Sequence, residues 1–473
     1  MRLKTVLLSG ILLFSANTLA TNYDVERSKY TKALKYYKNK DYKNFEKLKS
    51  QLINYPLYAD LEYKSLHRSK IKNDQKIIKF IEKYKTSYVS RKAYINLIYR
   101  LSSQNKYNKL IQNYENIGST DLHCLYIRAK IKSNLTKEID KEIIPIWLSS
   151  KSQPKSCDFV FKWFYKKGKL TDELVWQRIK ISLDSNNYSL GRYLVRFLSN
   201  KNKFWANSLL KTYINPKKNI ISKSYKKNNR YRNTILRYGL KRIAKKDYVK
   251  AKQYLKKSQS FYSLSDKKYF QLLQEIFTQG LKTNQKNIFN DKDMLSYENN
   301  DLYFTKALAN YAIYNSKWQR LINYIEKFPA YVSEEQKWIY WKGKAIYKLN
   351  KGNSNEVLGD LAKKRSYYGF LSAYLMNKPL NIKNIPYQAS KDELKNLGSR
   401  FEINRIYELF ILGKKRAARR ELKYLMDNSS AINFSSLSLL FQKWGWSDGV
   451  ILSYGKSKYF DHIEARFPIL YEE

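Results

Sequence analysis

Apolar residues recur at helical spacing along almost the whole chain. Near the start, two apolar stripes are separated by the polar turn Asn39-Lys40-Asp41 and end at Pro56. The first stripe consists of Ala33, Leu34 and Tyr37, and the second of Phe45, Leu48 and Leu52. This spacing predicts two antiparallel helices that bury their apolar faces against each other.

The same pattern returns far downstream, where one apolar stripe ends at Phe328-Pro329 and the next is followed by Gly352. The stripes consist of Trp318, Leu321, Ile322 and Ile325, and of Trp338, Trp341, Ala345 and Leu349. Ser333 and Gln336 have the spacing of a capping box at the start of the second helix. Because no strict sequence period links the pairs, the pattern predicts a degenerate solenoid of helix pairs rather than a consensus tetratricopeptide array.

The composition supports an all-α fold. The chain of 473 residues contains only 15 Gly and 8 Pro, less than half of the usual share of these helix breakers. Two segments interrupt the helical pattern. Residues 215–230 are polar and basic and are predicted to form a loop, and residues 377–398 are predicted to connect a large N-terminal solenoid to a small helical unit at 399–458.

The first twenty residues have the pattern of a cleavable signal peptide. Arg2 and Lys4 precede the short apolar run Thr5–Phe14, and Thr18-Leu19-Ala20 offers a small-x-small cleavage site. No Cys follows that site, so no lipid anchor is indicated, and no later segment reaches about 18 consecutive apolar residues. We therefore expect a periplasmic protein without a membrane span.

The formal net charge is +51. The simplest explanation is a bias toward AT-rich codons, which encode Lys, Asn, Tyr and Ile. The spread of the charge along the chain fits this explanation. A basic surface attracts polyanions whatever its origin, and nucleic acid, anionic lipid and a carboxylate-bearing cell-wall polymer are the candidate partners. Export excludes nucleic acid as the main partner.

Cys124 and Cys157 are the two cysteines of the chain. In an oxidising compartment we expect them to form a disulfide, and the alternative is a pair of buried apolar thiols. His67, His123 and His462 lack the paired spacing of zinc ligands, so no metal site is predicted.

No known catalytic or cofactor-binding motif is present, including HExxH, GxSxG, the P-loop and GxGxxG. Adjacent carboxylates such as Glu334-Glu335 and Glu472-Glu473 diverge by about 100° on a helix, so they cannot flank one glycosidic bond. We interpret them as solvated surface residues. The aromatic stripes are expected to be core, although single exposed Tyr or Trp residues could stack on sugars.

Four collinear stretches resemble the soluble lytic murein transglycosylase family of periplasmic bacteria. They are YPLYADLEYKSL (Tyr55–Leu66), the run Trp147–Ile179 that contains Cys157, RSYYGFLSAYLMNKPL (Arg365–Leu380) and the final stretch WGWSDGVILSYGKSKYFDHIEARFPILYEE at 444–473. The resemblance covers most of residues 22–473.

The resemblance implies names for the parts of the chain. After a signal peptide at 1–20, residues 21–380 would form the U-domain, a right-handed α-superhelix that closes into a ring. Residues 388–458 would form the small helical linker (L) domain. Residues 459–473 would be a truncated junction to a missing lysozyme-like catalytic domain.

In this family a single Glu protonates the glycosidic oxygen between N-acetylmuramic acid and N-acetylglucosamine. The 6-hydroxyl of the muramic acid then closes onto the anomeric carbon, which gives a 1,6-anhydro product. That Glu lies in a Glu-Ser motif followed by Gly-Leu-Met-Gln, and neither motif occurs in this chain. No catalytic residue is therefore assigned, and we expect the chain alone to be inactive. The resemblance implies a non-catalytic portion that engages peptidoglycan, with a separately encoded catalytic domain as a candidate partner. The alternative is a periplasmic helical-repeat scaffold that binds other proteins.

Overall fold

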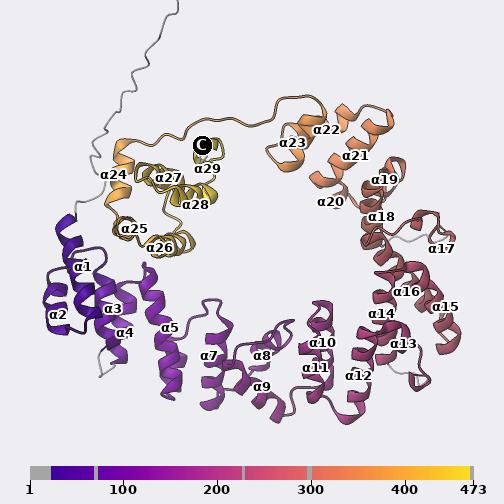
Figure 1. Ribbon diagram of the computed structural model, residues 1–473, viewed down its shortest axis with the longest axis horizontal. Coiled ribbons are helices and arrows are strands. Elements are labelled where there is room, and N and C mark those ends of the chain that lie inside the picture. The colour runs from indigo at the N-terminus through magenta and orange to yellow at the C-terminus, as the bar shows by residue number, and fades with distance from the viewer. Residues whose placement is uncertain (1–22, 69–72, 226–229, 296–300, 469–473) are drawn as a thin grey trace, which may run out of the picture. The chain divides into compact units, whose positions relative to one another are not determined.

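The computed structural model describes residues 23–68, 73–225, 230–295 and 301–468 (Figure 1). Every regular element within these ranges is a helix, which confirms the all-α prediction. None of these helices has both the length and the apolar character to cross a membrane. The predicted signal peptide at 1–20 and the pair Glu472-Glu473 lie outside the described residues.

The chain forms two compact units, which are described separately here. The first combines residues 1–114 with residues 383–473, and the second consists of residues 115–382. The first unit contains α1 (Asp24–Lys38), α2 (Tyr42–Ser50), α3 (Tyr58–Arg68), α4 (Asp74–Lys83), α5 (Tyr88–Ser103), α6 (Tyr107–Asn113), α24 (Lys391–Ser399), α25 (Phe401–Ile411), α26 (Lys415–Asn428), α27 (Phe434–Lys443), α28 (Ser447–Lys456) and α29 (Ile463–Arg466).

The second unit is a succession of short helices. They are α7 (Thr120–Lys132), α8 (Asp140–Trp147), α9 (Ser156–Lys166), α10 (Asp172–Asp184), α11 (Tyr188–Leu194), α12 (Asn200–Ile214), α13 (Pro216–Asn219), α14 (Arg230–Ala244), α15 (Tyr248–Tyr262), α16 (Asp266–Lys282), α17 (Lys292–Leu295), α18 (Leu302–Tyr314), α19 (Trp318–Glu326), α20 (Ala330–Ser333), α21 (Gln336–Leu349), α22 (Ser354–Ala362) and α23 (Tyr367–Leu375). Three 3₁₀ turns accompany them, at Val195–Phe197, Lys223–Tyr225 and Ile288–Asn290.

The first predicted helix pair corresponds to α1 and α2. Ala33 and Phe45, one from each predicted stripe, are fully buried. Between the helices Lys40 has a φ of +62°, and the carboxylate of Asp41 accepts the backbone N–H of Asn44 at 3.2 Å. The polar turn therefore reverses the chain and caps the second helix, as its residue types indicate.

The downstream pair is also present, but the predicted capping box is wrong. Ser333 ends the short helix α20, and its hydroxyl donates to the carbonyl of Ala330. The N-cap of α21 is Glu335, which makes no side-chain capping bond. Gln336 instead accepts a hydrogen bond from Ser366 at 2.5 Å. A contact distant in the sequence has replaced the local one, which a spacing rule cannot anticipate.

Both predicted interruptions are shorter than expected. The segment 215–230 contains the helix α13, which begins at Pro216, and the buried side chain of Ile220. Pro fits the first position of a helix because its missing N–H would be unpaired there anyway. The downstream connection runs only from the end of α23 to Lys391, where α24 begins with Ser390 as its N-cap.

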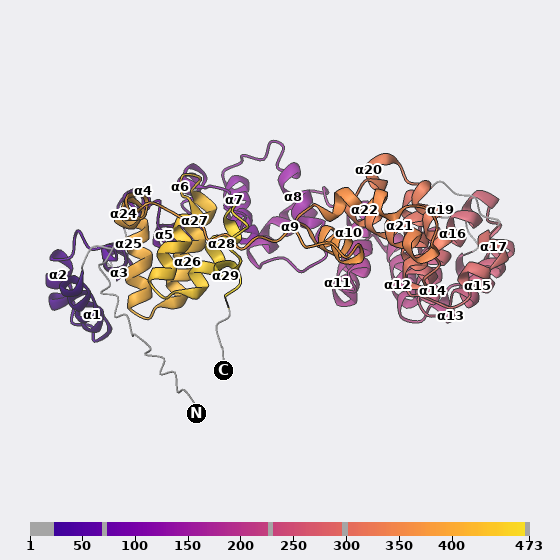
Figure 2. The same cartoon turned by 90° about the horizontal axis from the view of Figure 1, so that it is seen from above.

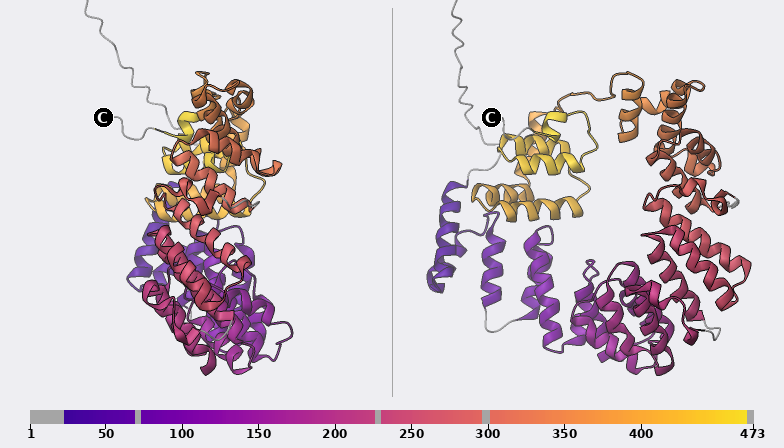
Figure 3. Two further views of the ribbon diagram at one scale, coloured as in Figure 1. Left: turned by 90° about the vertical axis from the view of Figure 1, so that its right-hand side faces the viewer. Right: turned by 45° about the vertical axis from the view of Figure 1, so that its right-hand side comes forward.

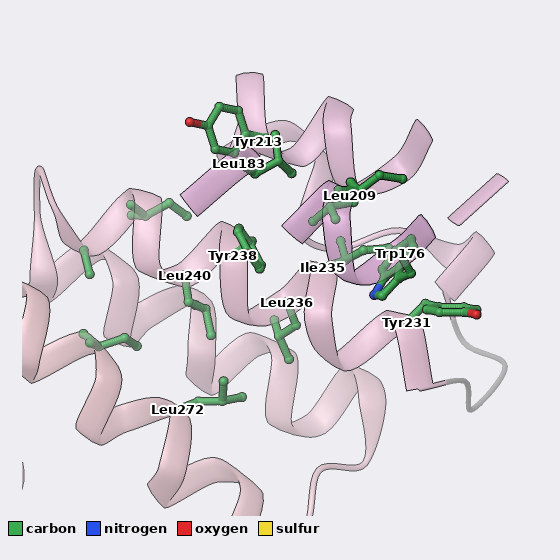
Figure 4. Close-up of a cluster of buried hydrophobic side chains, with 14 of the residues drawn as sticks. Trp176, Leu183, Leu209, Tyr213, Tyr231, Ile235, Leu236, Tyr238, Leu240 and Leu272 are labelled. Atoms are coloured by element: carbon green, nitrogen blue, oxygen red, sulfur yellow. The ribbon is translucent and has the colours of Figure 1, made fainter. Parts of the chain in front are cut away.

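The core of the second unit runs continuously through successive helices. Figure 4 shows one part of it, in which Trp176 of α10 and Leu209 of α12 face Ile235 of α14. The ring of Trp176 lies 4.3 Å from that of Tyr231, centroid to centroid. The helices α14, α15 and α16 pack on one another in turn (Figure 3). Each pair thus buries its apolar face on the next, as expected for a solenoid.

The core of the first unit is built from both ends of the sequence. Tyr30 of α1, Phe45 of α2 and Leu61 of α3 belong to the same buried cluster as Ile406 of α25 and Phe441 of α27. The helices α25 to α28 pack side by side in the views of Figures 1 and 2. Segments about 350 residues apart in the sequence therefore share one core.

The expected disulfide is present in the second unit. Cys124 on α7 and Cys157 on α9 are joined, with their Cα atoms 4.9 Å apart. Both side chains are fully buried. The bond therefore links two helices that also pack directly on each other.

Reduction of this disulfide is expected to destabilise the protein by about 3–4 kcal/mol, because the bond closes a loop of 33 residues. The measurement is the urea midpoint, followed by circular dichroism, with and without reductant. A double variant, Cys124→Ala with Cys157→Ala, is the control and should not respond to reductant. An unchanged wild-type midpoint with two titrated thiols would contradict the expectation.

Candidate functional site

The stretch Tyr55–Leu66, which stands out in the sequence, lies against α25 and α26. The hydroxyl of Tyr55 donates to Glu408 at 2.5 Å, and the carbonyl of Pro56 accepts from Arg405 at 3.2 Å. Asp60 on α3 pairs with the same guanidinium at 2.7 Å. The helix junction near the start of the chain is thus held by two charged residues of α25.

Glu408 is fully buried and receives a second contact from α1. The guanidinium of Arg27 binds its two carboxylate oxygens at 2.8 and 2.9 Å. Hydrogen bonding to Glu408 raises the pKa of Arg27 above its ordinary value. A bidentate pair of this kind fixes orientation as well as position.

Arg405 is the second buried charge and lies between two carboxylates. It is 2% exposed and binds Asp60 on one side and Glu421 of α26 on the other. Burial lowers the pKa of Arg405, but the two carboxylates outweigh burial and hold that pKa above its ordinary value. Glu421 also accepts the backbone N–H of Tyr88 at 3.0 Å, which ties in the start of α5.

A pocket of about 430 Å³ opens beside this network in the first unit. Helices α1, α3 and α5 form one side of it, and α25 and α26 the other. Its lining residues are Tyr37, Asp60, Tyr63, Lys64, His67, Tyr88, Val89, Lys92, Asn96, Arg405, Leu409, Ala417, Arg420 and Glu421.

Three cations of the pocket each lie over an aromatic ring. The Nζ of Lys64 is 4.6 Å from the ring centroid of Tyr37. The corresponding distance from Lys92 to the ring of Tyr63 is 5.3 Å, and Arg420 lies 5.6 Å from the ring of Tyr88. Rings position cations without neutralising their charge.

None of these three cations forms an ion pair with a carboxylate of the described residues. The two acids of the pocket, Asp60 and Glu421, are both bound to Arg405. The pocket therefore contains three cations without a direct ion pair, in a partly enclosed and aromatic setting. This arrangement can hold a carboxylate or another anion by charge-assisted hydrogen bonds.

The environment of the pocket lowers the pKa of the half-buried Lys64. Burial lowers its pKa below the ordinary lysine value, the charge of Asp60 opposes that shift, and the charge of Lys92 adds to it. A bound anion would relieve the repulsion between the two lysines. The electrostatics of the pocket therefore favour an anion.

The structure distributes the three histidines over separate places. His67 lines the pocket and stacks on Tyr63 with centroids 5.8 Å apart. His123 lies 3.7 Å from Glu142, and His462 is buried beside Tyr454. Within the described residues no group of three His, Cys, Asp or Glu is arranged to hold a metal ion.

The sequence analysis did not identify the cations of the pocket. Lys64 lies within a stretch that the analysis singled out, but its charge is one of 91 Lys and Arg. Lys92 and Arg420 carry no local signal at all. Of the predicted solvated carboxylates, Glu335 lies at the surface, 3.7 Å from Lys306.

These features define a helical-repeat protein whose terminal helices share one core and one cationic pocket. A model of the soluble lytic murein transglycosylase L domain matches residues 397–463, which include Arg405, Glu408 and Glu421. The soluble lytic murein transglycosylase of Escherichia coli K12 is 20% identical over 99% of this chain and 73% of its own length. That of Salmonella typhimurium is 20% identical over 98% of this chain and 72% of its own length. Over almost its whole length the chain is therefore similar to soluble lytic murein transglycosylases.

Solved structures show the same fold. The lytic transglycosylase Slt of Pseudomonas aeruginosa, solved as an inactive mutant, matches 94% of this chain and 73% of its own with a TM-score of 0.80 at 22% identity. The 70 kDa soluble lytic transglycosylase of Escherichia coli matches 95% of this chain and 73% of its own with a TM-score of 0.76 at 19% identity. That enzyme has also been solved in complex with bulgecin A. The superhelical fold class inferred from the sequence is confirmed.

Replacing Arg405 is expected to destabilise the protein strongly. Arg405→Leu leaves Asp60 and Glu421 without their shared cation, and removing one partner of a buried ion pair costs about 3–5 kcal/mol. The measurement is the urea midpoint by circular dichroism. Lys141→Leu is the control, because Lys141 is 75% exposed in its pair with Glu138 and should cost at most about 1 kcal/mol. Equal midpoints for the two variants would contradict a structural role of this network.

Lys92→Gln is expected to raise the pKa of Lys64, because it removes a nearby like charge. The measurement is the titration of ¹³Cε-labelled lysine by NMR, with the Lys64 signal assigned by Lys64→Gln. Lys43→Gln, on α2, serves as the control and should leave that pKa unchanged. A pKa of Lys64 that does not respond to Lys92 would show that the two amines do not share one site.

Proposed function

We propose that this chain binds murein in the periplasm and does not itself cleave it. The observation that carries the proposal is the pocket in which Lys64, Lys92 and Arg420 lack carboxylate partners among the described residues. Murein carries free carboxylates on its peptide stems. The pocket would therefore hold the chain on murein through these groups.

Similarity to the soluble lytic murein transglycosylases supports murein as the ligand, since these relatives are named for it. The non-catalytic role rests on this chain's own sequence, in which neither Glu-Ser nor Gly-Leu-Met-Gln occurs. General-acid chemistry needs a carboxylic acid with a raised pKa in a substrate cleft. Burial raises the pKa of Glu421 in the pocket, but its carboxylate is engaged by Arg405 and by the backbone N–H of Tyr88. Asp60 is bound to Arg405 as well, so we assign neither carboxylate as a general acid.

The net charge and the pocket act at different ranges. A charge of +51 attracts any polyanion, and salt screens that attraction over about 8–10 Å. A pocket adds short contacts that depend on geometry, so it can select one kind of anion. The proposed organisation into a signal peptide at 1–20, a U-domain at 21–380 and an L domain at 388–458 accords with murein binding outside the cytoplasm.

Retention on purified sacculi tests the proposal. Wild-type protein should be retained in a salt-sensitive way. A triple variant of the pocket, Lys64→Gln, Lys92→Gln and Arg420→Gln, should bind about tenfold or more weakly, because each lost charged hydrogen bond is worth about 1.5–3 kcal/mol. The measurement is the bound fraction after centrifugation over a range of protein concentrations.

The control is a triple variant with the same change in net charge outside the pocket: Lys217→Gln, Lys218→Gln and Lys267→Gln. Similar losses in both variants would show that charge alone governs binding and would contradict the pocket. No retention of wild type, with recovery of protein partners instead, would favour the alternative of a protein-binding scaffold. Release of anhydromuropeptides from the sacculi would overturn the non-catalytic role.

A further inference from the structure

A second hollow, of about 620 Å³, lies in the other unit between α16 and α18. It is lined by Leu281, Lys282, Thr283, Asn284, Tyr303, Lys306, Ala307, Asn310, Tyr311 and Tyr314. Six of its ten lining residues carry a hydroxyl or an amide group, and none carries a carboxylate. Its chemistry therefore differs from that of the cationic pocket in the first unit.

One face of α18 supplies most of the lining. Tyr303, Asn310 and Tyr314 follow one another at intervals of seven and four residues, which places them on the same side of a helix. At a rise of about 1.5 Å per residue, the two tyrosines lie about 16 Å apart along the helix axis. The face is thus long enough for an extended ligand rather than for a single small molecule.

Both tyrosines are exposed to an unusual degree for aromatic residues. Tyr303 is 60% exposed and Tyr314 is 76% exposed. Neither ring stacks on another aromatic ring of the described residues. Tyr303 is positioned by Lys282, whose amine bonds its hydroxyl and lies 4.3 Å from its ring centroid.

The polar groups between the tyrosines are held in place by neighbouring side chains. Asn310 accepts from Lys337 at 2.8 Å and donates to the carbonyl of Lys306 at 2.7 Å. Asn284 accepts from Asn315 at 2.7 Å, so the NH₂ group of Asn284 remains available to an outside acceptor. These fixed amides flank the aromatic faces at little entropic cost on binding.

We propose that this hollow binds a chain of N-acetylated sugars. Sugar rings combine an apolar face with hydroxyl and amide groups, and the hollow offers aromatic faces together with amide and hydroxyl partners. The absence of carboxylates from the lining and the few cations at its rim match a ligand that is largely uncharged. This inference rests on the proposed binding of murein and names its glycan as the ligand of a second site.

The experiment uses the neutral hexamer of β-1,4-linked N-acetylglucosamine and the 473-residue protein, with isothermal titration calorimetry at low and high salt. Wild type should bind with an affinity that salt changes by less than about twofold, because the probe is uncharged. Tyr303→Ala with Tyr314→Ala should weaken binding about tenfold or more, as expected for aromatic anchors of a binding site. Circular dichroism checks that the variant is folded.

Two controls separate stacking from general effects. Tyr314→Phe keeps the ring and should bind within about twofold of wild type. Tyr331→Ala with Tyr374→Ala removes two tyrosines that are 74% and 82% exposed but lie outside the hollow, and it should bind like wild type. Loss of binding in this second control, wild-type affinity in the Tyr303 and Tyr314 variant, or no binding by wild type would each overturn the inference.

The two proposals can fail independently. Retention on sacculi through Lys64, Lys92 and Arg420 is expected to persist in the double alanine variant of Tyr303 and Tyr314, and to remain sensitive to salt. If the hexamer fails to bind while that retention holds, only the sugar site is overturned. If the hexamer binds while retention ignores the three cations, the sugar site stands and the anion pocket falls.

Discussion

The first unit depends on a small set of buried charges that join the two ends of the sequence. Arg405 and Glu408, on one helix, bind Asp60 on α3 and Arg27 on α1. Buried ion pairs add little net stability over an apolar core, because desolvation offsets the attraction. They nevertheless require a precise geometry, because a buried charge that lacks its partner destabilises the folded protein. The network therefore fixes which surfaces of the terminal helices meet.

The same network determines the character of the pocket beside it. Arg405 binds both carboxylates that line the pocket, Asp60 and Glu421, and neither forms an ion pair with Lys64, Lys92 or Arg420. The charges that join the helices and the cations proposed to bind a ligand are thus different residues of the same pocket. The tyrosines beneath the three cations hold them in position and leave their charge available. The proposed anion site is thus a consequence of how these helices pack and pair.

The large net charge of the chain differs from the local charge of the pocket. The 91 basic residues are spread along the chain, and salt screens those that are exposed to solvent. In the pocket three of them converge, and between α16 and α18 lysines instead support exposed tyrosines and amides. The chain would then bind anionic groups in one unit and sugar rings in the other. A polymer that carries both features suits the two sites together.

The sequence by itself determined the all-α class, the helix pairs, the cysteine pairing and the family, because each depends on local spacing or on a few recognisable stretches. It could not place the capping of α21, where Gln336 bonds Ser366, or the short helix at Pro216. Only the tertiary structure decided that α1 to α3 share a core with α25 to α28, since nothing local encodes contacts across about 350 residues. The candidate sites belong to this second kind. Lys64, Lys92 and Arg420 are ordinary surface residues in the sequence, and they become a site because folding brings three helices together and commits the nearby carboxylates elsewhere.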